Sequence, residues 1–308
     1  MENHTNISQM EQIRADYDIN SFLDIDNRNQ KKVAYKLGLN SSSINRIIDE
    51  ARILSLFPNI QKSKAVPLSR IRNNRELKLF AEKYDIYNLQ VRQIYTLVKE
   101  WRKDIEKNPR MLLNDLQHDL IIGSTIGDAN IRQRNKNCSF RVGHSLPQKK
   151  YVEWKFEILK EFDNSEIKLR QKLRGGNLLN MFEFSINTHY VFNYYRNLFY
   201  KKNGDKVVTE KILNMINPRS LAIWLGDDGS YCIKQKYIIF CTNSFSLDGH
   251  KLMKKYFKET WNIDPTIGFR DNKYYYLRFK VDDTKKLVEI VRPFVPKFMK
   301  YKLGEENE

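Results

Sequence analysis

Two apolar runs in this sequence end in aspartate, and they carry the residues best suited to chemistry. The first run is IIGSTIGDA, residues 121–129, and the second is LAIWLGDDG, residues 221–229. Asp128 and Asp228 hold the same place in their runs, 100 residues apart. Two carboxylates beside bound phosphates form a site for Mg²⁺, which takes one or two carboxylates, substrate phosphate and water. The pair therefore predicts a magnesium site.

The two runs read as helices that can pack closely. Each has two small residues four apart, so the helix axes can approach nearer than the usual ~8–10 Å. Close packing brings Asp128 and Asp228 face to face across a pseudo-twofold axis. A carboxylate at a helix C-terminus opposes the macrodipole and ordinarily needs a compensating cation, which favours metal binding over the alternative of a plain turn residue. The small residues are Gly123 and Gly127 in the first run and Ala222 and Gly226 in the second.

From residue 112 onward the chain passes twice through one predicted series: helix, two strands, helix, two strands, helix. We place the first half at 109–204 and the second at 205–308. Two equivalent halves predict a pseudo-twofold molecule of mixed α/β class, in the α+β sense of helices packed on antiparallel sheets.

The predicted strands have one apolar and one cationic face. In EIKLRQKLRG, residues 166–175, a period of two puts Ile167, Leu169 and Leu173 on a core face and cations on the other. The hairpin at 266–280 alternates in the same way. A wet face of Arg, Lys, Gln, Asn and Tyr suits a duplex groove, whereas a merely soluble face normally mixes charge signs. The predicted DNA-contacting residues are Arg132, Arg134, Lys136, Arg141, Lys168, Arg170, Lys172, Arg174, Lys234, Lys236, Arg270, Tyr274, Tyr276, Arg278 and Lys280.

The composition favours a nucleic-acid partner. The chain has 54 Lys and Arg against 37 Asp and Glu, a formal net charge of +17. Ribosome-associated and membrane-surface proteins can also be basic, but we place nucleic acid first. No run approaches the roughly 18 apolar residues of a membrane span, and the N-terminus is too polar for a secretory signal. We expect no membrane partner and an intracellular protein, in the cytoplasm of a prokaryote or phage-infected cell, or in an organelle matrix.

The cysteines and histidines show no pattern that predicts a site. The three cysteines match neither a zinc site nor a disulfide framework and read as reduced core residues. Three histidines lie in different elements without ligand spacing and read as surface or phosphate-contacting residues. These residues are Cys138, Cys232 and Cys241, and His144, His189 and His250.

The region 1–60 contains the pattern of a helix-turn-helix at residues 31–54. Ala34 permits two helices to cross closely, Gly38 lies where the tight turn can need a positive φ, and Ile44 fastens the second helix. An ordinary helical hairpin with an N-capping serine is the alternative. In the first interpretation the groove-facing residues are Ser41, Ser42, Ser43, Asn45 and Arg46.

The region 61–108 is interpreted as a linker followed by a second helical unit. Residues 79–101 repeat the helix-turn-helix pattern, although Asp85 replaces the turn glycine. The stretch before them, PNIQKSKAVPLSRIRNNR at 58–75, carries two prolines and several basic residues. It reads as a linker that can lie along phosphates.

Over about residues 112–303 the chain resembles a LAGLIDADG homing endonuclease of the single-chain, two-motif, intron-encoded kind. The resemblance lies in IIGSTIGDA and LAIWLGDDG, and also in GDANIRQR, PRSLAIWLGDDG and the closing FMKYKL. The chain departs from the pattern at Ala129, where the motif usually ends in glycine. The resemblance implies two αββαββα halves that form a DNA-binding saddle, preceded here by an all-α helix-turn-helix region, and a monomer.

The resemblance also implies the site and the reaction. Asp128 and Asp228 would be catalytic and bind Mg²⁺, two or three ions shared by two active sites, with Mn²⁺ as a substitute; Ala129 and Gly229 would complete the metal site. Lys302 and Lys206 would tune water or transition-state charge, and Asp227 would be supporting or structural. The product would be a double-strand break with 3′ overhangs that promotes mobility of an intron or other element.

Two alternatives stay open. An intron maturase would share the fold and bind intron RNA, and a non-cleaving regulator would bind an operator through its helix-turn-helix units. An intein is not expected, because the chain starts at Met1 and ends YKLGEENE without a splicing junction.

Overall fold

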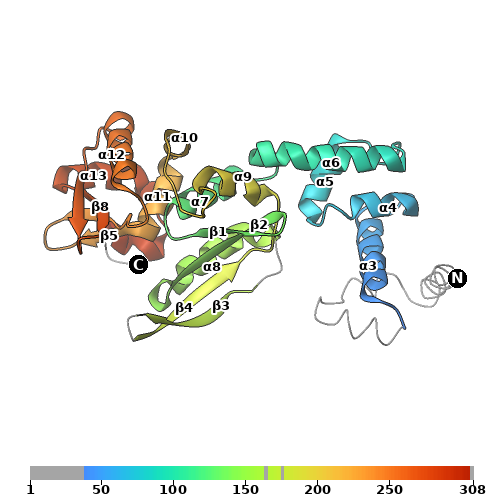
Figure 1. The fold of residues 1–308 in the computed structure, drawn as a ribbon, viewed down its shortest axis with the longest axis horizontal. Helices are drawn as coiled ribbons and strands as arrows, with labels where there is room; N and C mark the ends of the chain where they lie inside the picture. Colours follow the sequence, from blue (N-terminus) through green and yellow to red (C-terminus); the bar gives the residue numbers. More distant parts are fainter. Residues whose placement is uncertain (1–37, 163–165, 175–176, 306–308) are drawn as a thin grey trace. The chain divides into compact units, whose positions relative to one another are not determined.

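The computed structural model describes residues 38–162, 166–174 and 177–305. The chain divides into two compact units, Met1–Lys103 and Asp104–Glu308, each described by itself (Figure 1). Within the described ranges, no helix combines the length and apolar character needed to cross a membrane.

The first unit is helical. Asn40 caps its first described helix by accepting the backbone N–H of Ser43, and Gly38 just before it has φ +63°. The expected positive φ at Gly38 is therefore confirmed, whereas the helix predicted before it lies outside the described residues. The helices are α3 (Ser41–Leu56), α4 (Lys62–Leu68), α5 (Asn74–Lys83) and α6 (Val91–Lys107), which runs on into the second unit.

The stretch expected to be a linker is part of the folded core. Ala65 and Leu68 of α4 are buried, as is Ile71 after it. Lys64 is also buried, and its Nζ donates to the backbone carbonyls of Ile86 and Tyr87 at 3.3 and 2.5 Å. Its charge therefore faces carbonyl groups inside the unit and does not face phosphate.

The second predicted helix-turn-helix has a longer turn than that motif uses. Residues 84–90 separate α5 from α6, compared with three or four residues in a typical turn. Asp85 organises this turn, because its carboxylate accepts the N–H of Tyr87 and the side-chain amide of Asn88. Ile86 and Ile94 are buried, as the pattern predicts.

The second unit has the two predicted αββαββα halves. Each half has one four-stranded antiparallel sheet, in the orders β1-β2-β4-β3 and β5-β6-β8-β7. The first half is α7 (Asp115–Ile126), β1 (Asn130–Arg134), β2 (Asn137–Ser145), α8 (Lys149–Leu159), β3 (Lys168–Arg174), β4 (Asn177–Ser185) and α9 (Val191–Phe199). The second is α11 (Pro218–Asp228), β5 (Gly229–Cys232), β6 (Tyr237–Phe240), α12 (Leu247–Trp261), β7 (Thr266–Arg270), β8 (Tyr274–Phe279) and α13 (Val281–Val291); α10 (Glu210–Leu213) precedes it and a 3₁₀ segment, Lys297–Leu303, follows it.

The first sheet buries its apolar face under helices α8 and α9, but only in part. Phe140, Val142 and Phe184 are buried on β2 and β4. Leu169 and Leu173 of β3, expected in the core, are 55% and 75% exposed. The expectation fails because β3 is the edge strand, whereas α8 packs on β2 and β4.

The second sheet alternates as predicted. Leu277 and Phe279 are buried against an aromatic core that includes Trp224 of α11 and Phe257 of α12. Arg278 is opposite Ile239 and Thr266 in the strand register, so it lies on the other face with Tyr274 and Tyr276.

Candidate active site

Helices α7 and α11 pack against each other between the two sheets (Figure 1). Each begins with a capping box, Asn114 with Gln117 and Asn217 with Ser220. Residues 100 positions apart meet across the pseudo-twofold axis. At the N-terminal end the buried Asp119 accepts hydrogen bonds from its own counterpart, Arg219, at 3.0 Å and from the side chain of Asn217 at 2.8 Å.

The first helix packs as closely as its glycines predict. A Cβ on Gly123 would lie 2.4 Å from the carbonyl oxygen of Ser220 and 2.8 Å from Cβ of Ile223. A Cβ on Gly127 would lie 2.6 Å from Cβ of Asp227. These distances leave no room for a side chain, so both glycines are required by the approach of α11.

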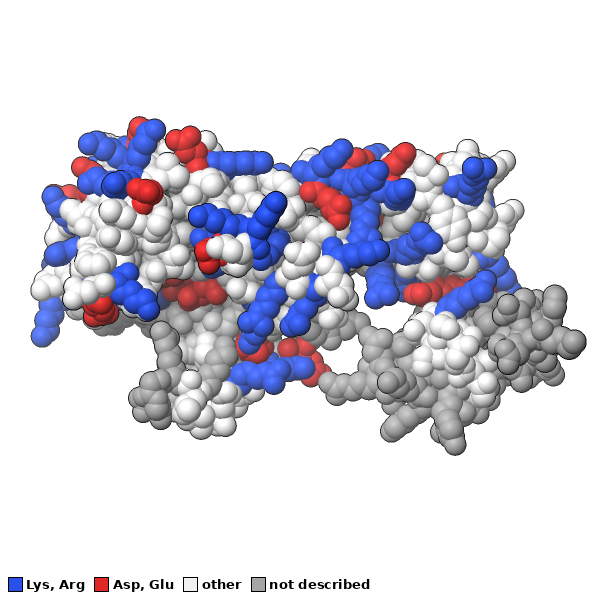
Figure 2. All heavy atoms as spheres, viewed as in Figure 1, with Lys and Arg blue, Asp and Glu red and all other residues white. Residues whose placement is uncertain are grey.

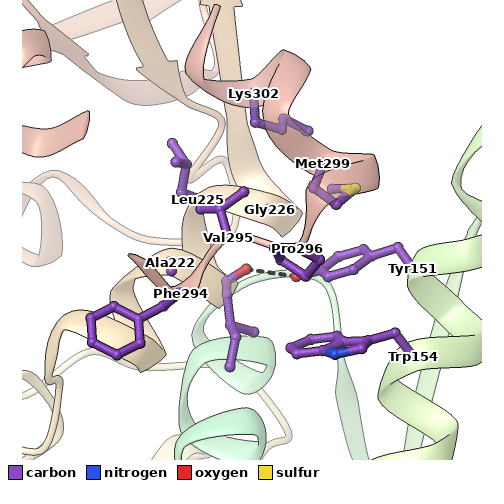
Figure 3. A pocket seen from close by; sticks show the side chains of 11 residues that line it. Tyr151, Trp154, Ala222, Leu225, Gly226, Phe294, Val295, Pro296, Met299 and Lys302 are labelled. Carbon is purple, nitrogen blue, oxygen red and sulfur yellow. Dashed lines mark hydrogen bonds between the residues drawn. The ribbon is translucent and has the colours of Figure 1, made fainter. Parts of the chain in front are cut away.

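The second pair of small residues serves a different contact from the one predicted. A Cβ on Gly226 would lie 2.4 Å from the hydroxyl of Tyr151, which belongs to α8 and donates to the carbonyl of Ile223 at 3.1 Å. Ala222 lines the same apolar hollow, where Tyr151 stacks on Trp154 (Figure 3). Gly226 therefore makes room for α8, and the two motif helices are not packed symmetrically.

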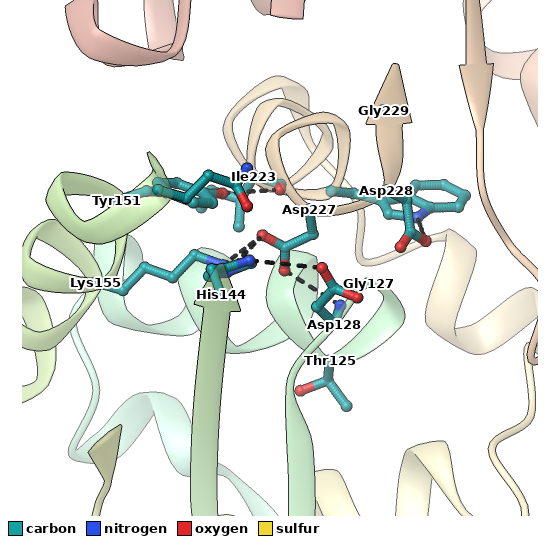
Figure 4. A network of polar contacts seen from close by, with 12 residues as sticks. Thr125, Gly127, Asp128, His144, Tyr151, Lys155, Ile223, Asp227, Asp228 and Gly229 are labelled. Carbon is teal, nitrogen blue, oxygen red and sulfur yellow. Dashed lines mark hydrogen bonds and ion pairs between the residues drawn. The ribbon is translucent and has the colours of Figure 1, made fainter. Parts of the chain in front are cut away.

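The carboxylates gather at the C-terminal ends of α7 and α11, as predicted. The side chain of Asp128 is 49% exposed, whereas that of Asp227 is fully buried. Asp228 is fixed by Trp224, whose indole N–H donates to its Oδ2 at 3.0 Å. Figure 4 shows Asp227 on the side of Lys155 and His144, with Asp228 on the opposite side of the cluster.

The electrostatics of this cluster favour a bound cation. Burial, followed by the charge of Asp227, raises the pKa of Asp128 to about 6. Burial also raises the pKa of Asp228, and the charges of Asp128 and Asp227 add to that shift. The C-terminal dipoles of both helices bring further negative potential to the same place. The charges of Lys155, Lys206 and Lys302 oppose the shift at Asp128 but do not cancel it, so a cation among the carboxylates would relieve the remaining repulsion.

The donor set fits Mg²⁺. Carboxylate oxygens are the ligands this hard cation prefers, and it keeps open positions for water and substrate phosphate. Across the part of the chain that the structure describes, no three His, Cys, Asp or Glu side chains are arranged to enclose a metal. Asp128 and Asp228 therefore suit an ion whose remaining ligands are water and substrate phosphate.

A lysine that follows the last helix of each αββαββα series returns to the motif of that series. Lys206 Nζ donates to the carbonyl of Gly127 at 2.6 Å, and Lys302 Nζ donates to the carbonyl of Gly229 at 2.6 Å. Burial lowers the pKa of both lysines, and the neighbouring aspartates oppose that shift. The structure therefore brings both predicted lysines to the carboxylate cluster.

A buried polar network beside Asp128 was missed in the sequence (Figure 4). Lys155 of α8 is fully buried, and its Nζ lies 2.5 Å from Oδ1 of Asp227 and 3.4 Å from Nε2 of His144. Oδ2 of Asp227 accepts the backbone N–H of Asp128 at 3.3 Å, and Nδ1 of His144 lies 3.6 Å from Oδ2 of Asp128. The sequence does contain a sign that Lys155 is buried, because this residue lies on the apolar face of its helix, four residues after Tyr151.

The expectation of surface histidines is wrong at two positions. His144 is 3% exposed, because the end of β2 inserts it between α8 and the motif helices; burial lowers its pKa to about 3. His250 is fully buried and bonds Thr242 at 2.7 Å. His189 is half-buried, and its ring accepts the N–H of Val191.

The predicted cations on the strands lie on one face of each sheet, away from the cores, whereas Lys136, Lys234 and Lys236 lie in hairpin turns and Lys280 is the N-cap residue of α13. Register pairs Arg132 with Ser139 and Asn130 with Arg141. Arg141 and Arg170 both pair with Glu183, the latter at 3.1 Å. Figure 2 shows basic side chains outnumbering acidic ones on the viewed face. Exposed members are Arg132, Arg134, Lys136, Lys168, Arg170, Lys234, Lys236, Arg270, Arg278 and Lys280; Lys172 and Arg174 lie on β3, but their side chains are outside the described residues.

The second sheet pairs its cations with aromatic rings. Arg278 lies over Tyr237 at 4.1 Å, and Arg270 lies over Tyr276 at 5.9 Å. Tyr274 is half-buried on the same face. In the helical unit, Ser42, Asn45 and Arg46 are exposed, and Ser43 is half-buried.

Comparisons with known proteins identify relatives. The model of a family described as the LAGLIDADG DNA endonuclease family matches residues 118–287. The chain is 26% identical over 209 residues to Protein RecA of Mycolicibacterium fallax, covering 63% of this chain and 47% of the relative. It is 26% identical over 216 residues to DNA endonuclease I-ChuI of Chlamydomonas applanata, covering 64% and 99%. It is 28% identical over 217 residues to Cytochrome b mRNA maturase bI2 of Saccharomyces cerevisiae, covering 66% and 50%.

The chain thus spans about half the length of some curated relatives, including the RecA proteins. Among solved structures, the homing endonuclease I-WcaI bound to its DNA recognition sequence has the same fold. The TM-score is 0.58 at 23% identity, over 66% of this chain and 92% of that one.

Proposed function

Because the chain belongs to the LAGLIDADG DNA endonuclease family, we propose that it is a homing endonuclease that hydrolyses phosphodiester bonds in double-stranded DNA. The observation that carries the proposal is the pairing of Asp128 and Asp228 at the adjoining ends of α7 and α11. A cation-bearing sheet leaves each of these helix ends, so a duplex on the sheets would bring its backbone to the carboxylates.

Asp128 and Asp228 would hold Mg²⁺, for which Mn²⁺ could substitute. When bound, the metal supplies Lewis-acid stabilisation of the scissile phosphate and an activated water. Trp224 holds one oxygen of Asp228 and so limits the orientation of the carboxylate. The main chain of Asp128 is fixed in turn by Asp227.

Lys206 and Lys302 would each place positive charge beside one scissile phosphate. Their bonds to the carbonyls of Gly127 and Gly229 fix both ammonium groups next to the motif ends before DNA arrives. Preorganised charge of this kind stabilises negative charge that develops in the transition state. One lysine for each motif matches one cleavage site for each strand.

The two sheet faces would read a long target, and the helical unit at 38–103 would extend the footprint. Contacts spread over both faces combine backbone neutralisation with weak base and shape readout. We propose a monomer that leaves 3′ overhangs and promotes mobility of an intron or other element.

The test is cleavage of a randomised duplex library by the full chain in Mg²⁺, in Mn²⁺, in Ca²⁺ and without metal. Breaks at one long sequence in Mg²⁺ or Mn²⁺, and not in Ca²⁺ or without metal, support the proposal and supply the target. Tight binding to a selected sequence without a cut in Mg²⁺ or Mn²⁺ would contradict it and favour a non-cleaving regulator.

The 28% identity to maturase bI2 favours a second candidate, an RNA-binding maturase. The two candidates make opposite predictions about binding. An endonuclease binds the library-selected duplex more tightly than structured intron RNA at equal salt, whereas a maturase reverses that order.

A further inference from the structure

The ion pair between Lys155 and Asp227 is buried beside Asp128, and the proposed reaction does not use it. Both side chains are fully buried, with 2.5 Å between Nζ and Oδ1. A buried ion pair is weak support for stability, because desolvation of two charges can exceed their attraction. Asp227 accepts the backbone N–H of Asp128, and Lys155 contacts His144, so the ion pair has a role at Asp128 besides stability.

The pair belongs to one side of the pseudo-twofold axis. The position equivalent to Asp227 in the first motif is Gly127, which has no side chain to offer. The helix equivalent to α8 is α12, and its buried residues include no lysine or arginine: Gly249, His250, Met253, Tyr256 and Phe257. Only Asp128 therefore has such a network beside it in the described residues.

The network also sets the orientation of His144. Nε2 of His144 lies 3.4 Å from the ammonium of Lys155, which has donors only, and 3.6 Å from Oδ1 of Asp227, so its shorter contact makes it an acceptor from Lys155. In a neutral ring the proton then resides on Nδ1. This nitrogen lies 3.6 Å from Oδ2 of Asp128, so the ring turns an N–H toward the carboxylate.

We propose that Lys155, Asp227 and His144 form a positioning assembly for Asp128, which holds its main chain through Asp227 and faces its carboxylate with the Nδ1–H of His144. The assembly acts on one of the two active sites, so it governs cleavage of one strand. This inference rests on the proposed endonuclease function.

The test separates positioning from folding with a neutral replacement of the pair. Lys155→Met with Asp227→Asn removes both charges and nearly keeps the side-chain volumes. The matched control is Lys160→Met with Glu157→Gln, which removes an exposed ion pair. Glu157 lies in the last turn of α8, and Lys160 directly follows that helix. Lys155→Met alone leaves a buried, unpaired carboxylate and reports on the cost to folding.

The probe is the duplex that the wild-type protein selects from the library, with a different fluorophore on each strand. The neutral double variant is expected to cut one strand roughly tenfold more slowly or worse, because small displacements of a catalytic group are costly. The other strand and the affinity in Ca²⁺ stay within about threefold of wild type, so nicked DNA accumulates. Equal slowing of both strands, or no slowing, would overturn the proposal.

A second measurement does not depend on cleavage. The ¹⁵N chemical shifts of the His144 ring give its tautomer, which is Nδ1–H in the wild type. In the double variant no ammonium faces Nε2, and the side-chain oxygen at position 227, which is 3.6 Å from Nε2 in the wild type, can accept a proton from it, so the ring is expected to shift to Nε2–H. An Nε2–H ring in the wild type overturns the assembly, even if the wild-type protein cuts no DNA and the proposed function fails.

Discussion

Gly127 and Asp227 occupy equivalent positions in the two motifs and meet where α7 and α11 pack. A Cβ on Gly127 would lie 2.6 Å from Cβ of Asp227 and 3.0 Å from its Oδ2. The absence of a side chain in one motif thus makes room for a buried carboxylate from the other.

Gly127→Ala should destabilise the protein, because the new methyl group must displace Asp227 from its bonds to Lys155 and Asp128. We expect a loss of about 1–3 kcal/mol in the free energy of unfolding, measured by urea denaturation. Asn197→Ala, on the exposed side of α9, is the control and should stay within about 0.5 kcal/mol. Wild-type stability of the Gly127 variant would show that α11 can move away without cost.

Lys206→Met and Lys302→Met should each slow cleavage without weakening DNA binding. The expected fall is about 10²–10³ in kcat, the typical loss when one preorganised charge is removed from a transition state. Single-turnover cleavage in Mg²⁺ and affinity in Ca²⁺ separate the two effects. Lys285→Met, which removes an exposed lysine of α13, is the control. A proportional loss of affinity in either site variant would assign that lysine to ground-state DNA binding instead.

Arg132 lies on one face of the first sheet and Arg278 on one face of the second. Arg132→Ala and Arg278→Ala should each weaken DNA binding in a salt-dependent way. If each guanidinium neutralises one phosphate, the slope of log affinity against log salt should fall by about 1 in each variant. Lys251→Ala on α12 removes a charge from a helix and should leave the slope unchanged. An unchanged slope in Arg132→Ala or Arg278→Ala would remove that face from the DNA interface.

His118 should make the fold acid-sensitive. Burial lowers its pKa from 6.5 to about 4, and its Nδ1 lies 2.5 Å from the hydroxyl of Tyr195. Between these pH values the unfolded chain binds a proton that the folded chain does not, so stability falls as pH decreases from 6.5 to about 4 and the loss is complete below that. The loss is about 3 kcal/mol for a shift of this size.

In His118→Asn this part of the acid sensitivity should be absent. We would measure the free energy of unfolding of wild type and variant by urea denaturation at about pH 7.5 and about pH 4.5. Most of the titration of His118 falls between these two pH values. If the difference in stability between the two proteins were the same at both pH values, His118 would not be the titrating group.

The sequence predicted those features that depend on local patterns. The alternation expected at 266–280 places Arg278 and Phe279 on opposite faces of β8. Asp128 and Asp228 were predicted because the repeat itself marks them. These features need only neighbours in the chain.

What the sequence did not predict depends on distant partners. Lys155 is buried because Asp227, 72 residues away, compensates its charge. Gly226 is small because Tyr151 of another helix needs the space, and Leu169 is exposed because β3 is an edge strand. The stretch at 58–75 was interpreted as a linker from its prolines, yet Pro67 lies inside α4, whose neighbours bury it.

We propose that Asp128 and Asp228 each complete an active site for DNA hydrolysis. The most direct test is strand-resolved cleavage of the library-selected duplex in Mg²⁺ by wild type, Asp128→Asn and Asp228→Asn. Wild type should make double-strand breaks, whereas each variant should bind the duplex in Ca²⁺ and make at most a single nick. Wild-type rates on both strands in either variant would show that the substituted aspartate is not part of an active site.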